Sequence, residues 1–372
     1  MEMVERMNTL TYLHLLKILA YLMNSCQNTT FFYRKYLMFC CLIALPLLFA
    51  ALAANAQSNP KWISYESKDG PGQGKHIVLV SGDEEYRSEE ALPMLAAILN
   101  EHHGFKTTVL FALDPNGEIN PDNASNIPGL EHLQSADLMV LFTRFRELPD
   151  EQMKYIDEYL KTGKPIIGMR TATHAFRYEK NKDSPYAKYS HDSETKGWED
   201  GFGRQVLGET WIDHHGDHGK EGARALINGI EQRNDHPILR GVHDIWVPTD
   251  VYGTRELTGD PTVLVWGLPT TGMRPDDSLN WRKSIMPMAW TKQYSTENGK
   301  SGKVFTTTMG ASIDLESEDL RRLLVNACYW SLDMDGQIPE KNNVAIVGKY
   351  DPTMFGFGGF QPGKKPADYA VK

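Results

Sequence analysis

The chain has 372 residues, and its 39 Lys and Arg against 48 Asp and Glu give a formal net charge of −9. This acidic balance, without a basic tract to hold phosphates, argues against nucleic acid as a partner. Of the four cysteines, Cys26, Cys40 and Cys41 fall within the first 41 residues, which leaves Cys328 alone in the remainder. A disulfide scaffold and a CxxC metal site are therefore excluded there.

Residues 1–56 read as a secretory signal. An apolar run over 36–54 follows Arg34 and Lys35 and ends in Ala54-Asn55-Ala56, a small-residue cleavage pattern. We expect cleavage after residue 56 and a periplasmic or secreted mature protein. The alternative is an uncleaved anchor, since the run is about long enough to span a bilayer, and the membrane would then be a partner through this leader alone.

Beyond the leader, the chain reads as a polar linker followed by an α/β domain. Residues 57–75 form the predicted linker, and short apolar strands then alternate with amphipathic helices. The expected strands are 76–81, 107–111, 137–143, 165–169 and 303–308. One expected helix begins at Ser88, and two others cover 150–162 and 316–332. Such alternation predicts parallel βαβ units with a mostly parallel sheet.

The rest of the chain is less regular. Residues 177–300 are rich in Gly, Asp, Trp and Pro, and we expect long loops and extra strands inserted into the same domain, which would cover 76–335. Residues 336–372 include a glycine- and aromatic-rich stretch that we expect to lie as an extended tail on the domain.

Polar turns follow four of the predicted strands, and ligands of open parallel sheets bind beyond the carboxyl ends of the strands. The candidate residues are Asp83, Glu84 and Tyr86 after the first strand, Arg144 after the third, and Arg170, Thr171, Thr173 and His174 after the fourth. Among them, His174 would act as general base or acid, Arg170 would stabilise an oxyanion or enolate, and Asp83 or Glu84 would orient a hydroxyl. The alternative is structural, with a threonine capping a helix and His174 bonded within the core.

A second cluster, in the loop 211–219, contains His214, His215 and His218 together with two aspartates. Imidazole and carboxylate are ligands for zinc and similar divalent metals. Adjacent His214 and His215 would point apart, so at most two or three of these groups could share one ion, with His174 completing the set. The alternative is a polar turn that binds substrate by hydrogen bonds.

Aromatic side chains in the irregular region are typical of sugar binding, because their faces stack on apolar sugar surfaces. We select Trp211, Tyr252 and Trp290 as candidate carbohydrate contacts. The alternative for each is packing in the core.

Several segments together resemble the ThuA-like family, named for a trehalose-utilisation protein. They include HIVLVSGDEEYRSEE, YLKTGKPIIGMRTATHAF, PTDVYGTREL and GKVFTTTMGAS, and they run from about 76 to 332. The resemblance implies a flavodoxin-like, doubly wound sheet with helices on both faces, similar to class I glutamine amidotransferases. Those enzymes place a nucleophilic Cys in the turn that here reads Gly168-Met169-Arg170-Thr171, so we expect no amidotransferase chemistry.

The family's links to disaccharide breakdown through 3-keto-sugars imply a small carbohydrate ligand. We therefore expect an exported carbohydrate-processing protein, a hydrolase, lyase or isomerase that acts on a sugar or 3-keto-glycoside by acid–base chemistry. One alternative is a non-catalytic carbohydrate-binding protein, and another is a scaffold whose tail assembles a homo-oligomer. In the enzyme, Asp83, Arg170 and His174 should face one cleft, with the His214-His215 loop over its mouth.

Overall fold

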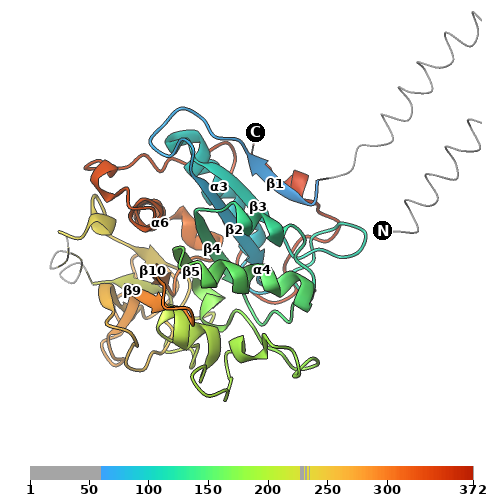
Figure 1. The fold of residues 1–372 in the computed structure, drawn as a ribbon. Coiled ribbons are helices and arrows are strands. Elements are labelled where there is room, and N and C mark those ends of the chain that lie inside the picture. Colours follow the sequence, from blue (N-terminus) through green and yellow to red (C-terminus); the bar gives the residue numbers. More distant parts are fainter. Residues whose placement is uncertain (1–59, 227–229, 231–232, 234, 372) are drawn as a thin grey trace, which may run out of the picture. The chain divides into compact units, whose positions relative to one another are not determined.

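The computed structural model describes residues 60–371, except 227–229, 231–232 and 234, and its centre is one sheet of ten strands (Figure 1). The predicted leader lies outside the described residues. In chain order the strands are β1 (Trp62–Tyr65), β2 (His76–Gly82), β3 (Lys106–Leu110), β4 (Leu138–Thr143), β5 (Ile166–Met169), β6 (Ala223–Ala225), β7 (Trp246–Val247), β8 (Thr262–Pro269), β9 (Met286–Ser295) and β10 (Ser301–Thr307). Within the described part, no helix is both long and apolar enough to cross a bilayer.

One half of the sheet is parallel. Its strands lie in the order β3-β2-β4-β5-β10, and all four pairings among them are parallel. The chain moves from β2 to β3 on one side and then returns to β4 on the other, so the strand order reverses at β2. The carboxyl ends of these strands meet at one edge, where open sheets of this kind bind ligands.

The other half is antiparallel and comes largely from the irregular region. The strands β9, β8, β6 and β7 extend the sheet beyond β10, and β1 pairs antiparallel with β3 at the opposite edge. A mixed α/β sheet with extra inserted strands is thus confirmed. We expected a mostly parallel sheet, but only four of the nine strand pairings are parallel. A flavodoxin-like, doubly wound arrangement is therefore not established. The predicted linker 57–75 also contains β1, so part of it belongs to the sheet.

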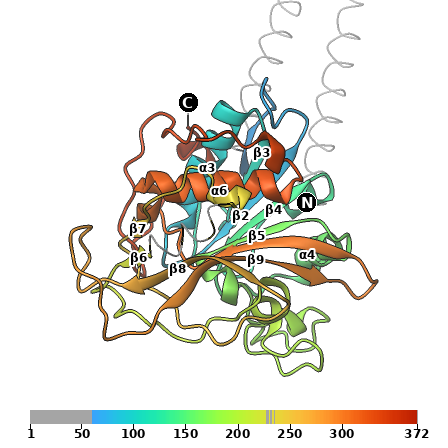
Figure 2. The same ribbon diagram turned by 90° about the vertical axis from the view of Figure 1, so that its left-hand side faces the viewer.

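Alternate side chains of β2 pack into two apolar layers, one on each face of the sheet, because successive residues of a strand point to opposite faces. Ile77 and Leu79 pack in the cluster that contains α3 (Ser88–His103) and α6 (Glu318–Ser331). Val78 and Val80 pack in the cluster that contains α4 (Asp150–Lys161) and the 3-10 helix η2 (Leu130–Gln134). Figure 2 shows α3 and α6 together on one side of the strands. The remaining thiol, Cys328, is buried in α6, as expected of a structural cysteine.

The start of α3 is tied to the turn after β2. The Ser88 side chain, at the first residue of the helix, does not cap it. Its hydroxyl instead accepts a hydrogen bond of 3.1 Å from the backbone N–H of Asp83 and lies 2.8 Å from Ser81 Oγ. Arg87 precedes the helix with φ of 60°, a left-handed conformation that a non-glycine residue adopts only when its surroundings hold it there. The turn is therefore fixed from both of its ends.

The C-terminal tail contacts the domain at several places. At its end, the N–H of Val371 donates a hydrogen bond of 2.8 Å to the Tyr65 hydroxyl on β1. Further back, the N–H of Gly356 donates a bond of 2.7 Å to the carbonyl of Glu85, in the turn after β2. The tail thus reaches the edge of the sheet at which the polar turns gather.

Candidate functional site

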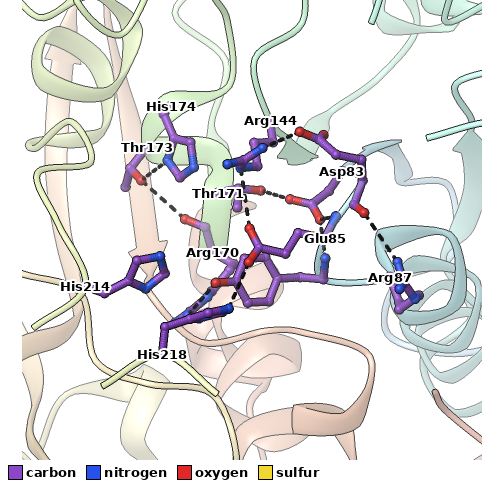
Figure 3. Close-up of polar contacts among 12 residues, drawn as sticks. Asp83, Glu85, Arg87, Arg144, Arg170, Thr171, Thr173, His174, His214 and His218 are labelled. Carbon is purple, nitrogen blue, oxygen red and sulfur yellow. Dashed lines mark hydrogen bonds and ion pairs between the residues drawn. The ribbon is translucent and has the colours of Figure 1, made fainter. Parts of the chain in front are cut away.

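The polar turns after β2, β4 and β5 come together at the carboxyl edge of the parallel strands (Figure 3). The predicted residues Asp83, Arg144, Arg170, Thr171 and His174 are all found there. Short contacts link the turns: the N–H of Phe145 donates a bond of 2.9 Å to the His174 carbonyl, and the N–H of Arg144 donates one of 2.9 Å to the Gly82 carbonyl. The turns meet at this edge, but Asp83 and Arg170 are fully buried, so these two side chains do not face an open cleft.

Asp83 organises the turn instead of facing a ligand. Its side chain is fully buried, and Oδ1 accepts the backbone N–H groups of Glu85, at 2.8 Å, and of Tyr86. Oδ2 accepts the Thr171 hydroxyl at 2.5 Å, which ties the turn after β2 to the turn after β5. Burial raises the pKa of Asp83, although these bonds oppose the shift. The predicted role in orienting a substrate hydroxyl has no exposed oxygen to support it.

Arg170 is equally enclosed. It follows β5 with φ of 45°, and its guanidinium lies between the rings of Tyr86 and Tyr252, at 4.4 and 3.9 Å from their centroids. Nη1 donates to the carbonyls of Asp250, at 2.7 Å, and Thr308, at 2.6 Å. Nη2 donates to Asp250 Oδ1 at 2.6 Å and to the Tyr86 hydroxyl at 3.1 Å. All four Nη hydrogens are used, and the one remaining donor, Nε, has no partner but is buried, so Arg170 is a positioning group without a solvent-facing donor for an oxyanion.

The group that Arg170 positions is Asp250, which is 1 % exposed. Its Oδ2 lies 2.7 Å from Nδ1 of His214, and its Oδ1 lies 3.4 Å from Nδ1 of His218. Burial disfavours the charged carboxylate, but Arg170 and the two imidazoles outweigh it and hold the pKa of Asp250 below its usual range. An ionised carboxylate can only accept, so Nδ1 of His214 carries a proton.

His214 and His218 form a pair at the surface of this network. Their ring centroids are 4.5 Å apart, and their side chains are 28 % and 34 % exposed. Nε2 of His218 lies 3.1 Å from the buried carboxylate of Glu85. The bonds to Asp250 and Glu85 raise the pKa of His218 to about 9. Among the described residues, Nε2 of His214 has no hydrogen-bond partner, so it remains available to a ligand.

His174 lies deeper, beside aromatic rings. Its Nδ1 is 3.1 Å from the Thr173 hydroxyl, and its ring centroid lies 4.9 Å from that of Phe145 and 5.4 Å from that of Trp211. Burial, reinforced by nearby cations, holds the pKa of His174 well below 6.5. Its imidazole is therefore neutral at physiological pH, and it is suited to hydrogen bonding more than to strong base catalysis.

The acidic turn also supports a cation at the rim. Glu84 pairs with Arg144 and, at 2.7 Å, with Arg146, and burial raises the pKa of this carboxyl group despite both cations. The Arg144 guanidinium lies 4.5 Å from the centroid of the Phe145 ring and 5.0 Å from that of Phe357 in the tail. Arg144 is 18 % exposed, so it is a cationic group that a ligand can reach.

The predicted aromatic contacts divide between site and core. Trp211 and Tyr252 lie near the histidines, with ring centroids 5.7 and 5.5 Å from that of His214. Tyr252 is only 2 % exposed and its ring packs on the Arg170 guanidinium, so it offers no free face to a sugar. Trp290 is instead fully buried, and its Nε1 donates a hydrogen bond of 2.7 Å to the Leu207 carbonyl. Its position on β9, within the sheet, makes it a packing residue and gives it no face for a sugar.

The structure brings three side chains together in a group that could hold a metal ion. Two of them, His214 and His218, were predicted from the sequence. Atoms of His214, His218 and Asp250 lie within 4.8 Å of one another. His215 does not join them, because its Nε2 faces the Ser284 carbonyl at 2.9 Å. The third member is Asp250, where the sequence suggested His174. A bound ion would compete with Arg170 for Asp250, and it would have to displace the proton that His218 shares with Glu85. The charges of these side chains already balance one another without an ion.

Sequence reasoning missed Asp250 and Glu85, two residues that hold the histidines. Asp250 follows β7, which has two residues and leaves no periodic signal. Glu85 looks like its neighbour Glu84 in sequence, and only the fold shows that it is 3 % exposed and faces His218. The one available signal for Asp250 was its place in the PTDVYGTREL segment.

Comparisons with known proteins agree with the resemblance seen in the sequence. No curated protein matches the chain. Among solved structures, a putative ThuA-like protein from Bacteroides uniformis is 14% identical, covers 74% of this chain and 98% of its own, and has a TM-score of 0.43. A second, from Parabacteroides merdae, is 14% identical, covers 76% and 97%, and has a TM-score of 0.44. The family model described as trehalose utilisation matches residues 76–331, and the chain therefore belongs to the ThuA family.

Proposed function

We propose that this chain is a carbohydrate-processing enzyme in which His214, oriented by Asp250, transfers a proton to or from a sugar or 3-keto-glycoside. The observation that supports it is the hydrogen bond of 2.7 Å between Nδ1 of His214 and the buried carboxylate of Asp250. A buried carboxylate on one ring nitrogen fixes the tautomer and aims the other nitrogen at the substrate. Here the other nitrogen, Nε2, belongs to a partly exposed ring.

The neighbouring groups suit a polyhydroxylated ligand. The imidazole of His174 is neutral and offers a hydrogen bond to a sugar hydroxyl, while Arg144 offers a charged donor at the rim. The rings of Phe145, Trp211 and Phe357 supply apolar faces of the kind on which sugars stack. The family's description as trehalose utilisation supports the same substrate class.

The test is turnover on a panel that contains trehalose, simple glucosides and 3-keto-glycosides. We expect turnover of at least one member and a loss of about 10²- to 10⁴-fold in His214→Gln, the range typical of a positioned acid–base group. The matched control is His215→Gln, because His215 is adjacent in sequence but bonds to Ser284 instead. Binding of a panel member without turnover by the wild-type chain would favour the non-catalytic binding protein.

We further propose that the enzyme is exported. The support is the basic flank, the apolar run over 36–54 and the Ala54-Asn55-Ala56 pattern. N-terminal sequencing of protein from the producing cell should give Gln57 as the first residue. A membrane-bound form that keeps the leader would overturn this proposal.

A further inference from the structure

A cavity of about 420 Å³ lies on the face of the sheet that carries α4, away from the histidines. It is lined by Leu160 of α4, by Lys292 and Tyr294 of β9, and by Tyr189 and Trp198. Because β9 is antiparallel to β10, these two β9 residues pair with Val304 and Gly302, whereas the catalytic edge lies beyond Thr307. Ligand pockets typically have volumes of about 300–1,000 Å³, so the cavity is large enough for a small molecule.

Lys292 is the unusual member of this lining. It is 6 % exposed and stands on β9 between the buried Trp290 and Tyr294. Its Nζ donates one long hydrogen bond, 3.4 Å, to the Gln205 carbonyl. Loop residue Gly259 makes room for it, since a Cβ there would lie 2.7 Å from Cε of Lys292. The side chain is therefore enclosed with little hydrogen bonding for an ammonium group.

No described carboxylate balances this charge, since none lies within 4.0 Å of Nζ of Lys292. Glu297, which lines the cavity, pairs with Lys188 at 2.5 Å, and the neighbouring Asp157 pairs with Lys161 at 2.7 Å, so both carboxylates already have a cation. Burial, with a smaller contribution from Arg204, lowers the pKa of Lys292 to about 8, which leaves the amine mostly protonated at neutral pH. A buried cation without a partner is unfavourable, so the cavity favours an anion.

We propose that this cavity is a second ligand site, which binds a small ring compound through a carboxylate or phosphate group placed at Lys292. The aromatic side chains of Tyr189 and Trp198 would contact the ring, and the anion would accept hydrogen bonds from the Lys292 ammonium group. The proposal does not depend on the function assigned to the histidines, because none of the cavity's lining residues belongs to that network.

Isothermal titration calorimetry of the whole chain tests the proposal with four probes: galacturonate, glucose 6-phosphate, inorganic phosphate and neutral glucose. We expect galacturonate or glucose 6-phosphate to bind one-to-one in this cavity, and we expect neutral glucose not to bind there. The first two probes distinguish a carboxylate from a phosphate, and inorganic phosphate shows how much affinity the ring adds. Lys292→Met should weaken anion binding at least tenfold.

Two controls make the result specific. Lys303→Met removes a lysine of β10 that pairs with Asp333, and it should leave binding unchanged. His214→Gln should also leave it unchanged, since that residue belongs to the other network. Circular dichroism and thermal unfolding confirm the fold of each variant, and Lys292→Gln replaces Lys292→Met if the latter misfolds. Failure of both ring anions to bind, or equal binding by the Lys292 variants, would overturn the proposal.

Discussion

Asp250 joins Arg170 to His214: one carboxylate oxygen accepts the buried guanidinium at 2.6 Å, and the other lies 2.7 Å from the imidazole. The Arg170 guanidinium keeps the Asp250 carboxylate ionised, and this carboxylate fixes the orientation of the His214 ring, which reaches the surface. The pair therefore has two effects that experiments can separate, one on stability and one on reactivity.

Asp250→Asn should lower the free energy of unfolding by about 3–5 kcal/mol, because it leaves the Arg170 charge buried without its partner. Denaturant unfolding measures the change. The matched control is Asp276→Asn, whose ion pair with Arg274 is exposed, and which should cost less than about 1 kcal/mol. Equal effects of the two substitutions would show that Arg170 does not depend on Asp250.

Stability should fall as the pH drops from about 6.5 to about 4, with His103 as one cause. Burial lowers the pKa of His103 from 6.5 to about 4, so the unfolded chain binds a proton in this window that the folded chain does not. The free energy of unfolding has its full value above pH 6.5. As the pH falls toward the pKa of His103 in the folded state, this group lowers it by about 1–3 kcal/mol. His103→Gln should reduce the slope of unfolding free energy against pH. His243→Gln, at an exposed position, should leave the slope unchanged.

Phe357→Ala should weaken carbohydrate binding without changing stability. The ring is 64 % exposed and lies 5.0 Å from the Arg144 guanidinium, so it contributes little to the core but borders the site. We expect KM to rise by about 2- to 10-fold with kcat nearly unchanged, as for loss of one stacking contact. The control is Met354→Ala, which removes an exposed apolar side chain of the same tail. A loss of the same size in both variants would assign the effect to the tail in general.

Elemental analysis should find no stoichiometric metal at the His214, His218 and Asp250 group, and chelators should leave the activity unchanged. The reason is that Arg170 already neutralises Asp250, while His218 shares its proton with Glu85. One divalent ion per chain, lost in His218→Ala together with activity, would replace this account with a metal centre.

The sequence predicts the regular elements well because their signals are local. The strand 76–81 is observed as His76–Gly82, and the helix 150–162 as Asp150–Lys161. The weak points are short or edge elements. β1 has four residues in a polar segment and is recognisable only through its pairing with β3.

The sequence predicts which polar turns gather at the carboxyl ends of the strands, but the roles of their residues depend on burial. Arg170 and Asp83 look like free polar groups after strands, yet the structure buries both and ties their side chains to neighbouring turns by hydrogen bonds. The partner of His214 lies 36 positions away, and no spacing rule connects the two residues. Long-range contacts of this kind follow from the whole sheet order and leave no mark in the local sequence.

The most direct test of the central claim is kcat/KM for His214→Gln, Asp250→Asn and the double variant, on a substrate that the wild-type chain turns over and at a temperature where all are folded. If Asp250 acts by orienting His214, the two form one unit, and the double variant should be no slower than His214→Gln alone. Losses that multiply in the double variant, or a His214→Gln enzyme as fast as wild type, would contradict the account.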